Sequence, residues 1–481
     1  MDLLIKGGTV INVSGRRCAD VAVSNGKIVA VGENLVPDPH TDIVEASGLF
    51  VLPGAIDVHT HFELPFGGGI SSADDFFTGT RAAACGGVTM VIDFVTPPKS
   101  PKTEQSAMRE GVRSGSDERN KGGGNYTGGG LMDAFKNRNA LAAAKACIDY
   151  SLHMGLSEVN DAILDEMDTV VKAGIASFKV FMTYEFRVTD NELKRALERA
   201  VSLNAVVMVH AEEHRTLENL KAKFIAEGKT DAWHHYLSRP ESVEAEAVKK
   251  AVWLAETTGA SLYIVHLACA GGLSRVAEAK REGYPIFAET CPQYLGFTRD
   301  VYKRDDGRNF VCSPPIKGSR SREALWQGVK DGSIDTVATD HCPFMTYEKA
   351  RGKDDFTKIP NGVMGVENLY PYMLSSAGKG SITFERAVEL CCYNPAKIFG
   401  CVQRKGGIAV GLDADIVIYD PSKEFTVSHK NMHSQTDYTI WEGFNMTGYP
   451  VRTYSRGILV YKNGDFLGSA GHGKFIKRKR I

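Results

Sequence analysis

Short apolar runs that each end at a polar residue recur along this chain. They read VLPGAIDVHTH at 51–61, ASFKVFMTY at 176–184, AVVMVHAE at 205–212, SLYIVHLA at 261–268 and DTVATDH at 335–341. Four of them place a polar side chain just after four or five residues that suit a strand buried on both faces. Such strands belong to parallel sheets.

Helical stretches alternate with these runs from Pro53 to about Gly400. Examples are NELKRALERAVSL at 191–203 and VEAEAVKKAVWLAETTG at 243–259. This alternation is the pattern of βα units and predicts a (β/α)8 TIM-like barrel over residues 53–400. In such a barrel the C-terminal strand ends face one mouth, so polar residues far apart in sequence can converge there.

Both ends of the chain have a different pattern. Short alternating strands punctuated by turn signals fill the first fifty residues, and the strand pattern returns in DADIVIYD at 413–420 and RGILVYKNGDF at 456–466. We expect residues 1–52 and 401–481 to build one small β-sandwich domain, discontinuous in sequence, beside the barrel that interrupts it.

Two segments fit neither domain pattern. Residues 99–130 are polar and glycine-rich and lack a hydrophobic period, which predicts a flexible insertion. Their glycine cluster would be a phosphate site only in a G-x-x-x-x-G-K-S/T motif after a strand, and that motif is missing from the sequence. The basic segment 473–481 is expected to lie in solvent or to dock onto another copy of the chain.

Length and composition agree with a soluble enzyme. The chain has 481 residues, 43% of them hydrophobic, and a net charge of −1, so no basic excess points to nucleic acid. No apolar stretch reaches the roughly 18 residues of a membrane span. The N-terminus does not have the features of a signal peptide, and the ten cysteines contain no C-x-x-C pair, so we expect a cytoplasmic protein.

Six residues close the apolar runs with groups that suit a two-metal site: His59, His61, Lys179, His210, His266 and Asp340. The period-two alternation of a strand points His59 and His61 to the same side, where they can share one cation. Taken singly, each histidine is more often a hydrogen-bonded core residue. The joint pattern favours a metal site.

Lys179 is the unusual member of this set, because an ammonium has no lone pair to offer a metal. One interpretation is an ion pair with a buried acid. The other is that carbon dioxide carboxylates an uncharged Lys179, giving N6-carboxylysine, whose two oxygens can bridge two metals. The four imidazoles and the carboxylate around it favour carboxylation.

The chain resembles the dihydropyrimidinase and hydantoinase group of cyclic amidohydrolases over nearly its whole length. The resemblance rests on DVHTH at 57–61, PFGGG at 65–69, SFKVFMTY at 177–184, VHAE at 209–212, IVHL at 264–267, CSPP at 312–315, ATDHCPF at 338–344 and IPNG at 359–362. It implies hydrolytic opening of 5,6-dihydropyrimidines or 5-substituted hydantoins to N-carbamoyl products, as in pyrimidine catabolism. It also implies the discontinuous β domain and a homotetramer.

The residues suggest how such a reaction would run. We expect His59 and His61 to hold one ion, His210 and His266 the other, Lys179 to bridge them and Asp340 to complete the first. Zn²⁺ suits these ligands best, with Mn²⁺ or Co²⁺ as substitutes. A water bridging two cations can have its pKa lowered from about 15.7 to about 7, which supplies hydroxide at neutral pH.

Asp340 has a second expected role, accepting a proton on attack and passing it to the departing nitrogen. The alternative is an N-cap aspartate. The resemblance implies that Tyr184 donates a hydrogen bond to the developing oxyanion, whereas the alternative is that it only packs. It also implies that the backbone groups of Ser313 and Asn361 pair with the substrate ring.

Other functions remain open at this point. Phe62 and Glu63 follow His61 where dihydroorotase-like enzymes usually have an arginine, which disfavours an anionic ring. An allantoinase-like ureide hydrolase is one alternative. A non-enzymatic scaffold of the same fold is another, but such proteins have lost metal ligands, and here all six are present.

Overall fold

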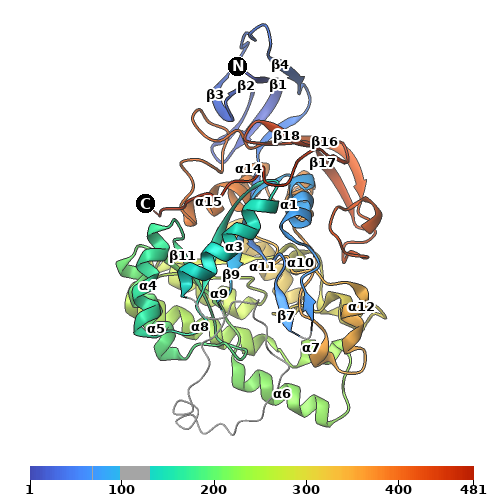
Figure 1. Cartoon of the computed structure of the whole chain (residues 1–481). Coiled ribbons are helices and arrows are strands. Elements are labelled where there is room, and N and C mark those ends of the chain that lie inside the picture. The colour runs from blue at the N-terminus through green and yellow to red at the C-terminus, as the bar shows by residue number, and fades with distance from the viewer. Residues whose placement is uncertain (68, 98–129, 481) are drawn as a thin grey trace.

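A parallel barrel forms the centre of the molecule in the computed structural model, which describes residues 1–67, 69–97 and 130–480 (Figure 1). Its eight strands are neighbours in sequence order, and all pair in parallel. They are β6 (Ala55–Thr60), β9 (Val88–Val95), β10 (Asp149–Gly155), β11 (Ser177–Phe181), β12 (Val206–His210), β13 (Ser261–Ile264), β14 (Ile286–Thr290) and β15 (Thr336–Val337).

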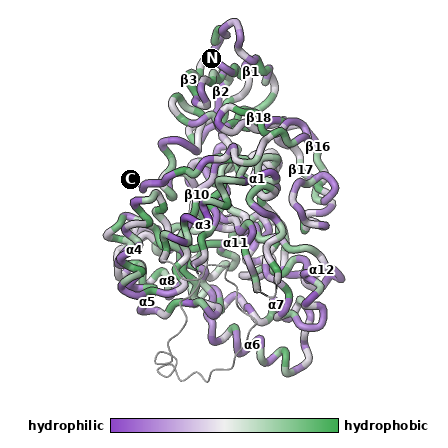
Figure 2. Tube along the Cα trace, viewed as in Figure 1, coloured by the Kyte–Doolittle hydropathy of each residue, from purple (hydrophilic) through white to green (hydrophobic). Residues whose placement is uncertain are grey.

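Helices connect and surround these strands. They are α1 (Phe76–Cys85), α3 (Leu131–Lys145), α4 (Asp161–Lys172), α5 (Asp190–Ser202), α6 (His214–Ala226), α7 (Ala232–Leu237), α8 (Glu241–Thr258), α9 (Ala270–Arg281), α10 (Pro292–Gly296), α11 (Ser319–Asp331), α12 (Thr346–Lys349), α13 (Leu369–Gly378), α14 (Phe384–Val388) and α15 (Asn394–Ile398). The two helical stretches predicted at 191–203 and 243–259 correspond to α5 and α8. Along these outer helices the hydropathy alternates, as expected for helices that cover a barrel on one face (Figure 2).

In the barrel, strand alternation divides the buried side chains of the strands between two clusters. Residues such as Ile92 and Met208 belong to the cluster inside the barrel, whereas their neighbours Val91 and Val207 pack in the larger cluster that includes the helices. This period-two division explains why the runs read as continuously apolar, since both faces of each strand are buried.

A nine-stranded mixed sheet is built from both ends of the chain. Its order is β19-β18-β17-β16-β5-β1-β2-β3, with β4 paired to β1. The strands are β1 (Leu3–Asn12), β2 (Gly15–Ser24), β3 (Lys27–Gly32), β4 (Asp42–Glu45), β5 (Phe50–Pro53), β16 (Ile416–Thr426), β17 (Asn445–Ser455), β18 (Ile458–Lys462) and β19 (Asp465–Phe466). In Figure 1 the N-terminal and C-terminal strands lie together above the barrel. The predicted (β/α)8 barrel with a small β domain from both termini is confirmed, and the domain predicted as a β-sandwich consists of one hydrogen-bonded mixed sheet.

The basic segment 473–481 is expected from the sequence to lie in solvent or to dock onto another copy of the chain, and the expectation of a tail in solvent is wrong for its buried residues. Ile476 is fully buried in the cluster inside the barrel, and Arg478 is only 2% exposed. The guanidinium of Arg478 donates to the hydroxyls of Ser151 and Ser177, at 2.7 and 2.9 Å. The tail therefore packs against the N-terminal ends of β10 and β11, where Ile476 and Arg478 are buried while the lysines of the tail stay exposed.

The flexible insertion predicted at 99–130 lies outside the described residues, apart from Gly130. Among the helices of the described ranges, none is long and apolar enough to cross a bilayer.

Candidate metal centre

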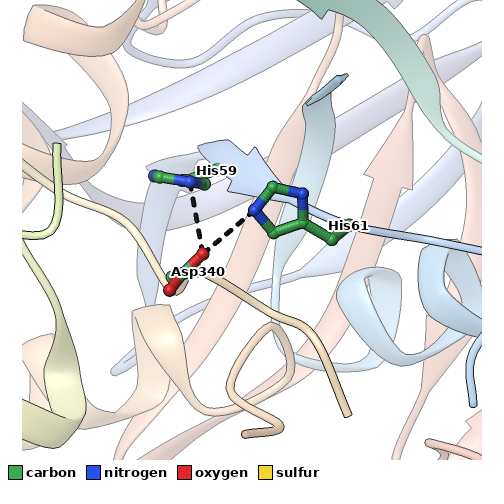
Figure 3. Close-up of side chains that lie close together, drawn as sticks. All are labelled: His59, His61 and Asp340. Atoms are coloured by element: carbon green, nitrogen blue, oxygen red, sulfur yellow. Dashed lines mark hydrogen bonds and ion pairs between the residues drawn. The ribbon is translucent and has the colours of Figure 1, made fainter. Parts of the chain in front are cut away.

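His59, His61 and Asp340 meet at the C-terminal mouth of the barrel (Figure 3). One oxygen of Asp340 lies 3.2 Å from Nε2 of His59 and 3.1 Å from Nε2 of His61. Potential ligand atoms of all three residues lie within 4.8 Å of one another. Two imidazoles and a carboxylate at this spacing can hold a divalent cation.

A local irregularity aims His59 at this point. Ile56 and Val58 already face the barrel interior, so strict alternation would turn His59 away. The pairing of β6 with β9 shifts register between Asp57 and Thr60, and such bulges re-aim side chains. The same-side arrangement of His59 and His61 therefore depends on a bulge as well as on the strand period.

His210 and His266 form a second pair of imidazoles beside the first. Nδ1 of His210 lies 2.9 Å from Nε2 of His266, and the rings of His266 and His59 are 5.4 Å apart between centroids. His210 continues the inward-facing series of Val206 and Met208 on β12. Four histidines from three strands or strand ends thus share one buried region.

Two carboxylates outside the predicted set orient these rings. Glu289 accepts a hydrogen bond from Nδ1 of His59 at 2.6 Å, and Glu212 accepts one from Nε2 of His210 at 2.8 Å. Burial lowers the pKa of both histidines, so the rings are neutral. Each neutral ring therefore carries its proton on the nitrogen that faces the carboxylate.

The remaining nitrogens fit a cation. With its proton directed at Glu289, His59 turns a lone pair towards the carboxylate of Asp340. His210 likewise turns one towards His266. The lone pair of His59 and an oxygen of the ionised Asp340 repel at 3.2 Å unless a positive ion lies near both. The 2.9 Å contact of His210 is a hydrogen bond when Nε2 of His266 carries the proton, and both nitrogens become free for a cation when that proton moves to Nδ1 of His266. Neutral imidazoles backed by carboxylates are also the usual arrangement of histidine ligands to metals.

Lys179 lies between the two histidine pairs. Its Nζ is 5.3 Å from the ring centre of Phe94, which contacts His59 and His61, and 5.0 Å from that of Phe181, which contacts His210. The side chain is 1% exposed, and no carboxylate of the described residues lies within 4.0 Å of Nζ. Burial lowers its pKa to about 8, although Asp340 and Glu289 oppose that shift.

Asp340 keeps its charge in this environment. Burial raises the pKa of its carboxyl group, but the hydrogen bond from His61 and the nearby Lys179 ammonium act against burial, and the net shift is downward. An ionised carboxylate is the form that can ligate a metal or accept a proton.

Three of the predicted site residues have left-handed backbone conformations: φ is +73° at Tyr184, +38° at His266 and +52° at Asp340. For residues other than glycine this conformation costs about 1–3 kcal/mol and is often retained at functional sites. At His266 the effect is visible, because Val265 before it faces the barrel interior and strict alternation would point His266 outward. The positive φ breaks the alternation and lets His266 face His210.

The predicted substrate residues gather beside the histidines. The ring of Tyr184 lies 5.2 Å from that of His210, and Nδ2 of Asn361 donates to Oγ of Ser313 at 3.0 Å. Burial raises the pKa of Tyr184 to about 12, although Arg239 and the nearby Ser313 hydroxyl oppose this shift. Tyr184 is therefore a neutral phenol that can donate a hydrogen bond.

The sequence contained signals for the two carboxylates that were missed. Glu289 closes the apolar run IFA at 286–288, the same pattern that marked the histidines, and Glu212 stands two residues after His210. Glu212 is held in turn by an ion pair with the buried guanidinium of Arg239. Nothing in the local sequence marks Arg239, which reaches this site from the end of α7.

Two further histidines and two cysteines near the site have structural roles. His341 is buried and turns away from the metal ligands, bonding Asp74 at 3.0 Å, and His153 bonds Ser177 inside the barrel. Burial raises the pKa of the Cys291 and Cys312 thiols, which fits inert packing and not a thiolate nucleophile.

Comparisons with known proteins agree with this geometry. The model described as the amidohydrolase family matches residues 50–460. A D-phenylhydantoinase of Escherichia coli (strain K12) is 40% identical over 100% of this chain and 98% of its own length. A D-hydantoinase structure from Bacillus sp. AR9 is 38% identical, with a TM-score of 0.91 and 100% of both chains covered. A dihydropyrimidinase structure from Brevibacillus agri NCHU1002 is 37% identical, with a TM-score of 0.92 over 100% of this chain and 99% of that one.

Proposed function

The chain belongs to the amidohydrolase family, and from this we propose that it is a hydantoinase or dihydropyrimidinase. It opens cyclic amide rings by hydrolysis. Its substrates are 5-substituted hydantoins, 5,6-dihydropyrimidines or both, and its products are N-carbamoyl amino acids. The relatives cover the whole chain, which disfavours an allantoinase or a scaffold protein.

The observation that carries this proposal is the convergence of the predicted ligands at one barrel mouth. His59 and His61 would hold one ion with Asp340, and His210 with His266 would hold the second. Lys179, carboxylated on Nζ, would bridge them. Its place between the histidine pairs, with no carboxylate among the described residues within 4.0 Å of Nζ, supports this role. When bound, the ions supply Lewis acidity, which lowers the pKa of water and makes a carbonyl more electrophilic. Zn²⁺ suits the ligands best, and Mn²⁺ or Co²⁺ could replace it.

The protein groups divide the remaining chemistry. The carboxylate of Asp340 accepts the proton of the attacking water and delivers it to the ring nitrogen as the C–N bond breaks. The hydroxyl of Tyr184 donates to the carbonyl oxygen on which negative charge develops. The main-chain groups of Ser313 and Asn361 pair with the N–H and C=O of the ring. Because backbone groups recognise only the amide edge, varied ring substituents are tolerated.

Substrate profiling tests the proposal. Purified protein with its metal content measured would be assayed on dihydrouracil, dihydrothymine, 5-substituted hydantoins, allantoin and dihydroorotate. We expect the protein to hydrolyse a hydantoin or a dihydropyrimidine, and to hydrolyse allantoin and dihydroorotate little or not at all. A metal-loaded protein that prefers allantoin would overturn the assignment. We also propose a cytoplasmic homotetramer, for which light scattering gives the mass.

A further inference from the structure

Lys349 is a fully buried lysine at the C-terminal end of α12. Its Nζ donates hydrogen bonds to main-chain carbonyl oxygens on two different loops. The acceptors are Val311 at 2.8 Å, Pro360 at 2.8 Å and Gly362 at 2.7 Å. One side chain therefore ties together segments that are about fifty residues apart in sequence.

The three contacts identify the form of this lysine. No carboxylate of the described residues lies within 4.0 Å of Nζ, and burial lowers the pKa of Lys349 to about 7. A neutral amine has only two N–H groups and a lone pair that would face a carbonyl oxygen. Three short contacts to carbonyls need the three donors of an ammonium, so the charged form fits the geometry.

The two loops held by Lys349 carry Ser313 and Asn361. They also contact each other directly, since the amide of Gly362 donates to the carbonyl of Val311 at 3.0 Å. The side chains of Ser313 and Asn361 bond across the same gap. The separation of the loops is thus fixed by bonds that converge next to the proposed substrate residues.

Neighbouring carbonyls on the first loop are occupied as well. Nε2 of His235 donates to the carbonyl of Cys312 at 2.9 Å, and the hydroxyl of Tyr294 donates to that of Pro314 at 2.8 Å. Within the described ranges, in contrast, the main-chain N–H and C=O groups of Ser313 and Asn361 bond no protein group. Buried side chains satisfy the flanking carbonyls and leave these groups for a ligand.

We propose that Lys349 is a positioning residue that sets the distance between the two loops. At this distance the main-chain groups of Ser313 and Asn361 can both form hydrogen bonds with the amide edge of the substrate ring. This role rests on the proposed function. Lys349 itself does not touch the substrate or the metal ligands. Its loss should therefore weaken substrate binding far more than the chemical step.

Lys349→Met tests this role, because methionine is unbranched, only one atom shorter than lysine, and removes all three donors. We expect KM for a good cyclic amide substrate to rise about tenfold while kcat changes less than about threefold, as for loss of binding that ground and transition states share. Metal content should stay at the wild-type value. Lys349→Gln keeps two donors and should show a smaller rise in KM, and it carries the same comparison if the methionine variant does not fold.

Lys358→Met is the matched control. Lys358 lies in the same region of sequence, but its side chain is 58% exposed, and among the residues the structure describes its ion pair is with Asp355, at 3.2 Å. Wild-type KM is expected for this variant.

Hydrogen–deuterium exchange gives a reading that does not depend on activity. In Lys349→Met the amide of Gly362 and its neighbours at 359–364 should exchange faster than in wild type, whereas strand β12 should not change. If wild type opens no cyclic amide but this exchange rises, the proposed function fails and the positioning of the loops stands. Unchanged exchange, or a wild-type KM in a folded Lys349→Met enzyme, would overturn the inference.

Discussion

The carbonyl oxygen of His341 accepts a hydrogen bond from the amide of His61 at 2.8 Å, and the amide of His341 donates to the carbonyl of His59. This contact closes the barrel between its last and first strands. Because Asp340 directly precedes His341, the same contact places the Asp340 carboxylate beside both histidines. Asp74 and the amide of Gly365 hold the His341 ring, so the position of Asp340 is fixed from two sides.

Asp340→Asn should abolish most turnover without unfolding the protein. Asparagine has nearly the same size but cannot accept the proton, and loss of a general acid or base typically costs about 100- to 10,000-fold. Rates are to be compared with metal content and melting temperature. The control is Asp331→Asn, an exposed aspartate at the end of α11. Near-normal turnover in a folded, metal-loaded Asp340→Asn enzyme would remove the catalytic assignment.

Tyr184→Phe should lower kcat about 100- to 1,000-fold, because one oxyanion donor is lost while the ring stays packed against His210. KM should change much less. Steady-state kinetics on one hydantoin suffices, with Tyr347→Phe, a tyrosine that is 63% exposed, as the control. Full activity in the phenylalanine variant would leave Tyr184 with a packing role only.

Lys179→Met should bind fewer than two ions per chain and lose activity by at least about 100-fold, since a bridging metal pair supplies several kcal/mol of transition-state stabilisation. Elemental analysis of the purified variant measures the first effect. In wild type, chelation should remove activity, and Zn²⁺ should restore it faster with bicarbonate than in buffer freed of carbon dioxide. Equal recovery in both buffers would argue against carboxylation.

Glu289→Gln should weaken metal binding about 10- to 100-fold, the usual effect of removing a carboxylate behind a histidine ligand. Glu289 accepts hydrogen bonds from His59, from the main-chain amide of His266 and from the hydroxyl of Tyr263. A glutamine side chain has only one acceptor oxygen, so it cannot accept from these donors as the two oxygens of the carboxylate do. Competition with a metal indicator gives the affinity, and Glu282→Gln, an exposed residue after α9, is the control. An unchanged affinity would show that His59 does not need this support.

Several features of the site could not be predicted from local sequence patterns. His266 faces inward only because its φ is +38°, and the strand period alone would predict the opposite direction. Arg239 and Lys349 lie in no motif, yet each is buried with its charge directed at site elements. The basic tail was misread because Arg478 meets its partners on strands about 300 residues away in sequence.

The amino-acid sequence determined the barrel, the mixed terminal domain and the set of candidate ligands. This was possible because burial on both strand faces imposes continuous apolar runs, and any polar group that ends such a run stands out locally. The tertiary structure decided which way each ligand points, what orients it and how the barrel closes. These features depend on a bulge, on single left-handed residues and on hydrogen bonds between distant segments, none of which leaves a periodic trace along the chain.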